Sequence, residues 1–408
     1  MLDWVIVGGG IHGTYASNQI LKAGRANPEK VLVIDPHDRP LAVWKLCTEN
    51  TGMEFLRSPA EHNLDAGSGA LKRFARERAS GAAEFYSKYK RPSLRLFNAH
   101  CDHVVDSGNL STMRHNASAL SLSRKGKSYI VTTTEGEFES KRVILGIGMA
   151  DCLSMPAWAK ELHAVSPIVH VFSTDFAAAA AREWSKVVVV GGGISAMQVA
   201  LSLSKKRPGQ VTMLHSREFK IKQFDADPCW LGPKCLNLLA REANFVERRR
   251  RVDSARHWGS FPEDVRRQAH GAMISKTISF VENSVVSASG DSGSVRLTLE
   301  DQSLIEADLV VLATGFERCL PGGALVRQAI DEMNLPCAPC GFPVLDKYLR
   351  WSDGLFVTGA LAELVIGPAS RNIIGARMAS ERIISADIPR PYRPRELSYY
   401  YYRSRRTG

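Results

Sequence analysis

Two short apolar runs in the chain are each followed at once by a glycine-rich turn and then by a helical pattern. The first run covers residues 4–7 and leads into the turn at residues 8–13, and the second covers residues 187–190 and leads into the turn at residues 191–196. Uninterrupted apolar runs of this length are typical of parallel strands that are buried on both faces. The pattern therefore predicts two units of strand, glycine turn and helix.

The end of each unit also follows one plan. In the first unit, alternating apolar and polar residues predict a hairpin over residues 129–140, and an apolar strand at residues 142–145 then runs into glycine. In the second unit, the hairpin covers residues 295–307 and the strand covers residues 309–313. Two copies with the same order of parts indicate a duplicated fold.

The second copy lies inside the first, because the chain continues after it into a further apolar strand at residues 354–359 and a helix at residues 372–384. We predict an α/β fold with two Rossmann-like, doubly wound, three-layer domains, the second domain being inserted into the first. The predicted bounds are residues 1–160 and 306–385 for the first domain, 161–305 for the inserted domain and 386–408 for a basic C-terminal tail.

Each glycine of the first turn has a physical role in binding a dinucleotide. Gly8 makes the tight turn, Gly10 lets the backbone approach a pyrophosphate, and Gly13 packs helix against strand. The amino end of the following helix meets the phosphate charge with free amides. Asp35 ends the next apolar strand about twenty residues later, where a carboxylate accepts the ribose hydroxyls. The sequence therefore predicts a dinucleotide site here.

The second turn carries Gly191, Gly193 and Ser195, with Ala196 in place of the last glycine, which this motif permits. Arg217 follows the next strand, where the first copy has an acid. A guanidinium group there binds the 2′-phosphate of NADPH, although a solvated loop position is the alternative. We expect FAD on the first domain and NADPH on the second, with hydride passing from nicotinamide to flavin.

Composition narrows the class of protein. The 408 residues are 44% hydrophobic and carry a net charge of +11, part of it in the run from Arg248 to Arg251 and part in the tail. We interpret that run as a solvated helix end and the tail as a loose terminus, and expect no nucleic-acid partner. The absence of a secretion leader and of a membrane-length apolar stretch predicts a cytoplasmic protein.

The eight cysteines do not form a recognisable disulfide framework, and we expect thiols. Cys229 and Cys235 lack the spacing and the partner pair of a zinc site, and no metal site is predicted. Cys337 and Cys340 have redox spacing but lie in a proline-rich loop, where ordinary thiols are the default interpretation.

The order of the two glycine turns, Asp35 and the sequence Ala313-Thr314-Gly315 resembles the flavoproteins with two dinucleotide-binding domains, over nearly the whole chain. That group includes disulfide reductases and class B flavin monooxygenases. Trp44, His170 with the phenylalanines after it, and Gly359-Ala360 are similar to the monooxygenase branch that contains the lysine and ornithine N-hydroxylases. The resemblance implies that Trp44, Thr314, Gly315 and Gly359 contact cofactor.

Two segments are candidates to line the reaction site. One contains Arg57 and His62, and the other contains Arg371 and Asn372 before the last helix, whose amino end should face the flavin. We consider Arg57, His62 and Asn372 as catalytic candidates and Arg371 as a cofactor contact. Helix capping and surface ion pairs are equally good explanations for these residues.

The resulting hypothesis is an enzyme in which NADPH reduces FAD and O2 then hydroxylates a nucleophilic nitrogen or sulfur of a small metabolite through a flavin hydroperoxide. One alternative is an NADPH-dependent reductase or oxidase that passes electrons to another acceptor. A second is a nucleotide-binding redox sensor without catalytic activity. The sequence does not give the substrate or the oligomeric state.

Overall fold

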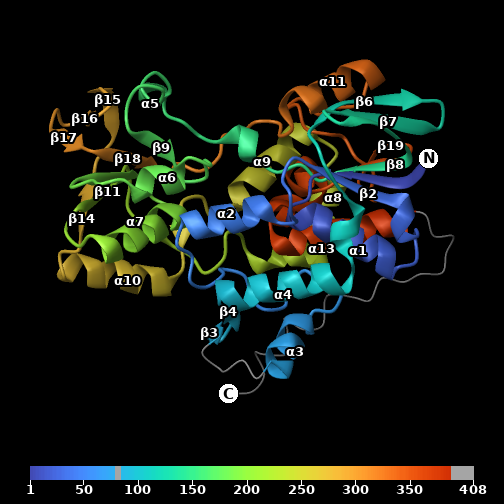
Figure 1. Cartoon of the computed structure of the whole chain (residues 1–408), viewed down its shortest axis with the longest axis horizontal. Coiled ribbons are helices and arrows are strands. Elements are labelled where there is room, and N and C mark those ends of the chain that lie inside the picture. The colour runs from blue at the N-terminus through green and yellow to red at the C-terminus, as the bar shows by residue number, and fades with distance from the viewer. Residues whose placement is uncertain (79–83, 387–408) are drawn as a thin grey trace.

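The computed structural model describes residues 1–78 and 84–386, and two lobes of mixed helices and strands lie side by side in it (Figure 1). The predicted basic tail, apart from residue 386, lies outside the described residues. None of the helices in the described ranges is long and apolar enough to cross a membrane.

The first domain is built on an eight-stranded sheet with the order β19-β20-β8-β1-β2-β5, to which β7 and then β6 are added at β8. Strands β1, β2, β5, β8 and β20 run parallel, and β7 makes the predicted hairpin with β8. The strands are β1 (Leu2–Val7), β2 (Val31–Asp35), β5 (Arg114–Asn116), β6 (Ala119–Lys125), β7 (Ser128–Thr133), β8 (Gly136–Leu145), β19 (Arg350–Ser352) and β20 (Leu355–Val357).

The helices of the first domain bury its apolar strands. Helix α1 packs against α13, and both contribute to the core that contains Trp4, Ile6 and Phe356. A second core beside the sheet is formed largely by α3, α4 and the segment around Leu56. The helices are α1 (Ile11–Lys22), α2 (Ala42–Asn50), α3 (Ala70–Glu77), α4 (Leu94–Ser107), α11 (Gly323–Met333), α12 (Glu363–Ile366) and α13 (Ile373–Ser385).

The second domain repeats the arrangement with a five-stranded parallel sheet in the order β14-β11-β10-β18-β9. An antiparallel sheet, β15-β16-β17, contains the second predicted hairpin. The strands are β9 (Ile168–His170), β10 (Val187–Val190), β11 (Val211–His215), β14 (Ile278–Glu282), β15 (Val285–Gly290), β16 (Val295–Leu299), β17 (Leu304–Ala307) and β18 (Leu309–Leu312), and the helices are α5 (Ala157–Lys160), α6 (Phe176–Ala181), α7 (Ile194–Lys206) and α10 (Glu263–Ile274). The predicted fold class is confirmed.

The predicted domain boundary at residue 306 is wrong. Strand β18 pairs in parallel with β10 on one side and with β9 on the other, so it is an interior strand of the second sheet. A strand that hydrogen-bonds on both edges belongs to the domain of its partners, and the chain returns to the first domain only after Leu312. The uninterrupted apolar run identified the strand but not its sheet.

A helical segment of the inserted chain packs on the first domain. It contains η5 (Pro228–Leu231), α8 (Pro233–Arg241) and α9 (Phe245–Ala255), and both α8 and α9 contact α12. Leu231 and Leu236 lie against the core of the first domain. The assignment of all of residues 161–305 to the second domain is therefore wrong for this segment, hereafter the crossing segment (residues 224–258).

Four cysteines form disulfides, contrary to the expectation of thiols. Cys152 pairs with Cys319, and Cys229 pairs with Cys235. The first pair joins the two linkers between the domains, where Leu153 and Phe316 form an antiparallel bridge. Sequence spacing could not reveal this pair, because its members are 167 positions apart and meet only in the fold. Cys337 and Cys340 are free and exposed.

The glycine at the third position of the first turn provides a test of the fold. A Cβ atom at Gly13 would overlap the carbonyl oxygen of Gly8. Because backbone cannot yield as a side chain can, we expect Gly13→Ala to lower the free energy of unfolding by about 1–3 kcal/mol and to lower flavin content. Urea denaturation and the flavin absorbance measure the two effects. Gly271→Ala is the matched control, because a Cβ there meets nothing on exposed α10; equal losses in both variants would contradict the prediction.

Candidate cofactor and substrate cleft

The first glycine turn has the geometry of a phosphate cradle. Gly8 has a φ of 107°, and a Cβ atom on it would lie 2.5 Å from the carbonyl oxygen of Gly146 at the end of β8. A Cβ atom on Gly10 would meet nothing within 4 Å, so the space in front of this residue is open. Gly10 is the N-cap of α1 and has no side chain that could cap the helix. No acidic residue lies in the first turn. The amides at this helix end are thus free to bind an anion.

Asp35 lies beside this turn at the end of β2. One carboxylate oxygen accepts a hydrogen bond from the Gly9 amide at 2.6 Å, and the other is 3.4 Å from Nη2 of Arg114. Gly359, with a φ of 69°, faces the ring of His12, whose Nδ1 is 2.7 Å from the Thr358 hydroxyl. Burial lowers the pKa of His12 to about 4, so the imidazole is neutral near pH 7. The residues around this turn therefore fit the uncharged sugar and the pyrophosphate of a dinucleotide.

The second turn repeats this geometry on α7. Gly193 is the N-cap, without a side-chain cap bond and without an acid in the first turn. Arg217 is exposed beyond β11, and its guanidinium group lies against Gly259. Within the described part of the chain, the Arg217 side chain makes no ion pair. A free guanidinium group near an open helix end fits a phosphorylated dinucleotide.

A cleft of about 710 Å³ lies between the two domains and gathers most of the predicted site residues. It is lined by Trp44, Arg57, His62, Gly191, Gly193, Ser195, Arg217, Thr314, Gly315, Arg371 and Asn372. The remaining predicted residues, Gly8, Gly10, Gly13, Asp35 and Gly359, surround the first turn. Ile11 connects the two regions, because it starts α1 and also lines the cleft.

Arg57 joins the two domains across the cleft. Its guanidinium group donates to the carbonyl oxygens of Lys222, Gln223 and Ser260 and to the Ser260 hydroxyl, at 2.8–3.2 Å. Burial lowers its pKa to about 10, which still leaves it charged near pH 7. Four of its five N–H donors are thus engaged with protein, and the structure gives Arg57 a positioning role.

His62 lines the cleft as a neutral imidazole. It is 7% exposed, and burial, with a smaller effect of Arg377, lowers its pKa to about 3. A group with this pKa does not exchange a proton with water near pH 7. An acid–base role for the catalytic candidate His62 near neutrality therefore does not fit its surroundings.

Asn372 and Trp44 make contacts that the sequence did not predict. The Asn372 amide donates to both carboxylate oxygens of Asp225 in the crossing segment, at 3.1 and 3.2 Å, and does not cap α13. Nε1 of Trp44 donates to Asn98 at 3.0 Å while its ring packs against Phe97. Both side chains are fixed by these bonds, and both present a surface to the cleft.

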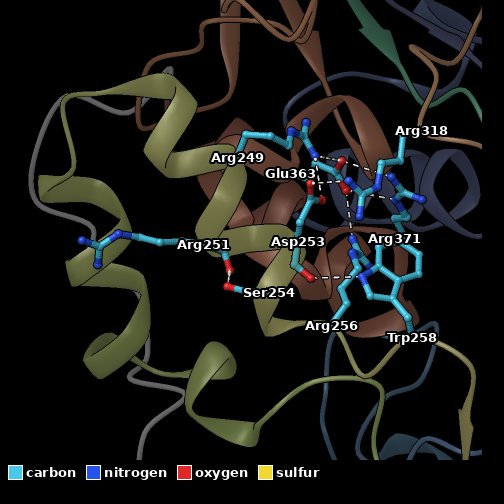
Figure 2. A network of polar contacts seen from close by, with 9 residues as sticks. All are labelled: Arg249, Arg251, Asp253, Ser254, Arg256, Trp258, Arg318, Glu363 and Arg371. Carbon is cyan, nitrogen blue, oxygen red and sulfur yellow. Dashed lines mark hydrogen bonds and ion pairs between the residues drawn. The ribbon is translucent and has the colours of Figure 1, made fainter.

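Arg371 belongs to a network around Glu363 (Figure 2). Its Nε and Nη2 donate to the two oxygens of Glu363 at 3.0 Å each, and Arg249 and Arg256 bind the same carboxylate. Glu363 has no exposed surface. Burial alone would raise the pKa of Glu363, but the three guanidinium groups lower it below its ordinary value, so the carboxylate is ionised.

Several residues of this wall were missed or assigned another role. Arg249 lies in the run interpreted as solvated, yet its side chain is only 16% exposed, whereas Arg250 is 70% exposed. Arg249, Asp253 and Arg256 share one face of the helical turn, and this helical spacing was the available signal. Trp230 of the crossing segment packs against Gly367 of the first domain.

The chain belongs to the pyridine nucleotide-disulphide oxidoreductase family, whose model matches residues 2–381. A search of curated proteins by sequence finds no match. The similarity to solved structures is therefore a similarity of fold, at low sequence identity.

Three of the similar structures are two ornithine hydroxylases and a cadaverine monooxygenase. Ornithine hydroxylase from Pseudomonas aeruginosa has a TM-score of 0.75 at 15% identity, with 94% of this chain and 98% of that chain covered. Ornithine N-hydroxylase from Kutzneria sp. 744, in complex with reduced FAD, NADP+ and L-ornithine, has a TM-score of 0.74 at 16% identity, with 95% and 98% covered. Cadaverine monooxygenase from Erwinia amylovora, bound to FAD, has a TM-score of 0.73 at 13% identity, with 94% of each chain covered.

The buried His62 makes stability depend on pH. In the unfolded chain it titrates near its ordinary value of 6.5, whereas in the folded protein its pKa is about 3. Between these values the unfolded state binds a proton that the folded state does not, so stability falls as the pH decreases through this window. We expect His62→Gln to flatten the dependence of unfolding free energy on pH by about 1 kcal/mol per pH unit below about pH 6, measured by urea denaturation. His270→Gln, on exposed α10, controls for the loss of an imidazole, and an unchanged slope in His62→Gln would contradict the assignment.

Arg217 should discriminate between the two nicotinamide dinucleotides. Loss of charge-assisted hydrogen bonds worth about 1.5–3 kcal/mol weakens binding by roughly ten- to a hundredfold. We therefore expect Arg217→Ala to raise the Kd for NADPH by this factor and to leave the Kd for NADH nearly unchanged. Titration of the flavin-loaded protein with each nucleotide measures both values. Equal losses for NADPH and NADH would rule out a 2′-phosphate contact.

Proposed function

We propose that the chain is an FAD-dependent, NADPH-consuming monooxygenase that hydroxylates a nucleophilic nitrogen of a small amine. The observation that carries the proposal is the cleft. It is lined by the amino end of one helix from each domain, and each of these helices follows a glycine turn. The family membership and the similarity of fold to two ornithine hydroxylases and a cadaverine monooxygenase support the same reaction class. For one turnover, amine, NADPH, O2 and a proton give hydroxylamine, NADP+ and water.

The first turn and Asp35 would hold FAD, and the second turn with Arg217 would hold NADPH. Bound FAD would supply the redox chemistry and oxygen activation, which no side chain can provide. The amino end of α13, with Asn372 held by Asp225, contributes oriented amides to the cleft wall. These residues position cofactor and substrate, so no catalytic base is required of the protein.

The walls of the cleft limit access of water. Ile11, Met53, Leu56 and Ile373 line it from the first domain. Phe172 stacks on Phe316 at a centroid distance of 5.2 Å and an interplanar angle of 8°, and both rings also line the cleft. Apolar walls protect a reactive oxygen species from water until substrate is bound. His62 adds a neutral polar group to this lining.

A second candidate function is an NADPH-dependent disulfide reductase. It is favoured by the Cys229–Cys235 disulfide, because Cys229 directly precedes Trp230, which lines the cleft, although the two cysteines themselves do not. Electrons from NADPH would then break this S–S bond and leave two thiols. The exposed pair Cys337 and Cys340 is not among the residues that line the cleft.

The two functions make opposite predictions for oxygen. We expect purified, flavin-loaded protein with NADPH and a panel of small amines of different charge to consume one O2 per NADPH and to yield a product heavier by one oxygen atom. Oxygen uptake, NADPH absorbance and mass spectrometry measure these quantities, and catalase detects uncoupled peroxide. The variant Cys229→Ser/Cys235→Ser should keep this activity. Reduction of a disulfide dye that is lost in the double variant, without oxygen uptake, would instead establish the reductase.

A further inference from the structure

The Glu363 network brings two arginines that are far apart in the sequence to one carboxylate oxygen. Oε2 of Glu363 accepts from Nη2 of Arg256 at 2.9 Å and from Nε of Arg371 at 3.0 Å (Figure 2). Arg256 comes from the crossing segment, and Arg371 ends η7 (Gly367–Arg371) before α13. Both side chains line the cleft. A buried carboxylate thus fixes two guanidinium groups next to each other at the wall of the proposed substrate site.

Each of these two guanidinium groups keeps an unused nitrogen. The Nη1 atoms of Arg256 and Arg371 have no acceptor within residues 1–78 and 84–386, and Nε of Arg256 is buried without a partner. The side chains are 8% and 17% exposed, and the two Nη1 atoms are not among the fully buried atoms without a partner, so water reaches them. An anion bound by both groups would replace this water with charge-assisted hydrogen bonds.

The network also has more positive than negative charge. Arg249, Arg256, Arg318 and Arg371 share the two carboxylates of Glu363 and Asp253, which leaves two positive charges in excess. The other acids on the cleft do not balance this excess. Asp225 lies within Coulombic reach of Arg256 but also of Arg57, whose guanidinium group is bonded to neutral acceptors, so adding this pair of charges leaves the excess at two. Asp227 is exposed, and water screens its charge. Two unbalanced charges match a dianion better than the single carboxylate of a zwitterionic amino acid.

The aromatic ring of Trp258 lies beside two arginines of the same network. The guanidinium groups of Arg256 and Arg318 lie 5.6 and 5.9 Å from its ring centre, and its Nε1 donates to the Asp253 carbonyl oxygen at 3.0 Å. These contacts hold Arg256 in place from the side opposite Glu363 (Figure 2). Arg217 lies against Gly259, next to Trp258 in the chain, so the phosphate contact proposed for NADPH and the Arg256 site are adjacent but formed by different residues.

We infer that Arg256 and Arg371 form an anion subsite of the cleft, and that the substrate carries a dianionic group, a phosphate monoester or a pair of carboxylates, at the end remote from the atom that is hydroxylated. The statement that the bound molecule is a substrate that becomes hydroxylated rests on the proposed function, whereas the anion subsite itself does not. It predicts that diamines such as cadaverine are poor substrates of this chain. A phosphate monoester and a pair of carboxylates both offer anionic oxygens to the two planar guanidinium groups, and binding experiments can distinguish between them.

Anion binding to flavin-loaded protein tests the subsite without turnover. Saturating NADP+ is added first, so that the Arg217 site is filled, and inorganic phosphate or malonate is then titrated by calorimetry and by the change in flavin absorbance. We expect one of the two anions to bind at low millimolar concentration or tighter, and Arg371→Gln and Arg256→Gln each to weaken it at least tenfold. Arg371→Lys, which keeps the charge but not the planar fork, should lose less.

Arg250→Gln is the matched control, because Arg250 lies on the same helix and is exposed, with only Glu247 as partner. It should bind the anion as the unaltered protein does. Flavin content and the thermal midpoint of unfolding establish that each variant is folded. If Arg371→Gln does not fold, the anion affinity of Arg256→Gln tests the inference. Anion affinity that is unchanged in both variants, or equally weakened in Arg250→Gln, would overturn the inference, as would loss of NADP+ affinity in place of anion affinity.

The result separates this inference from the proposed function. Anion binding that depends on Arg256 and Arg371, in a protein that forms no oxygenated product, would support the subsite and refute the monooxygenase. Efficient hydroxylation of cadaverine that is equal in Arg371→Gln and in the unaltered protein would support the monooxygenase and refute the subsite.

Discussion

The fully buried carboxylate of Glu363 is the constraint on which the shape of the cleft depends. An ion without exposed surface must be paired, because removal of its partners leaves an uncompensated charge in the interior. Its three arginines come from two segments that are more than a hundred positions apart in sequence, so the charge can be satisfied only when the crossing segment lies on the first domain. The same contact places Asp225 beside Asn372, and thereby one wall of the cleft.

Local patterns predicted the fold class correctly because its strands, glycine turns and helices are each specified by residues that are close together in the sequence. Apolar runs that end in glycine identified β1 and β10, and the φ of 107° at Gly8 and the open space before Gly10 are the features that the glycine spacing encodes. The boundary at residue 306 was wrong because strand order in a sheet is a long-range property. β18 follows a hairpin in the chain, yet it lies between β10 and β9.

The site was predictable where a residue acts through its own turn and not where it acts through a distant partner. The helix amino ends and Arg217 follow from spacing, and they line the cleft. Arg57, Asn372 and Arg371 were predicted to be site residues and line the cleft, but their partners Ser260, Asp225 and Glu363 are contributed by other segments. Charge runs were likewise ambiguous, since Arg249 and Arg250 are neighbours in sequence with opposite burial.

The bond between Cys152 and Cys319 has a topological consequence for the inserted domain. The two residues stand where the chain leaves the first domain and where it returns, so the intervening residues become a covalently closed ring attached at one point. A single peptide-bond break within that ring would leave every residue tethered, and the two lobes would remain one molecule as long as the sulfurs stay oxidised.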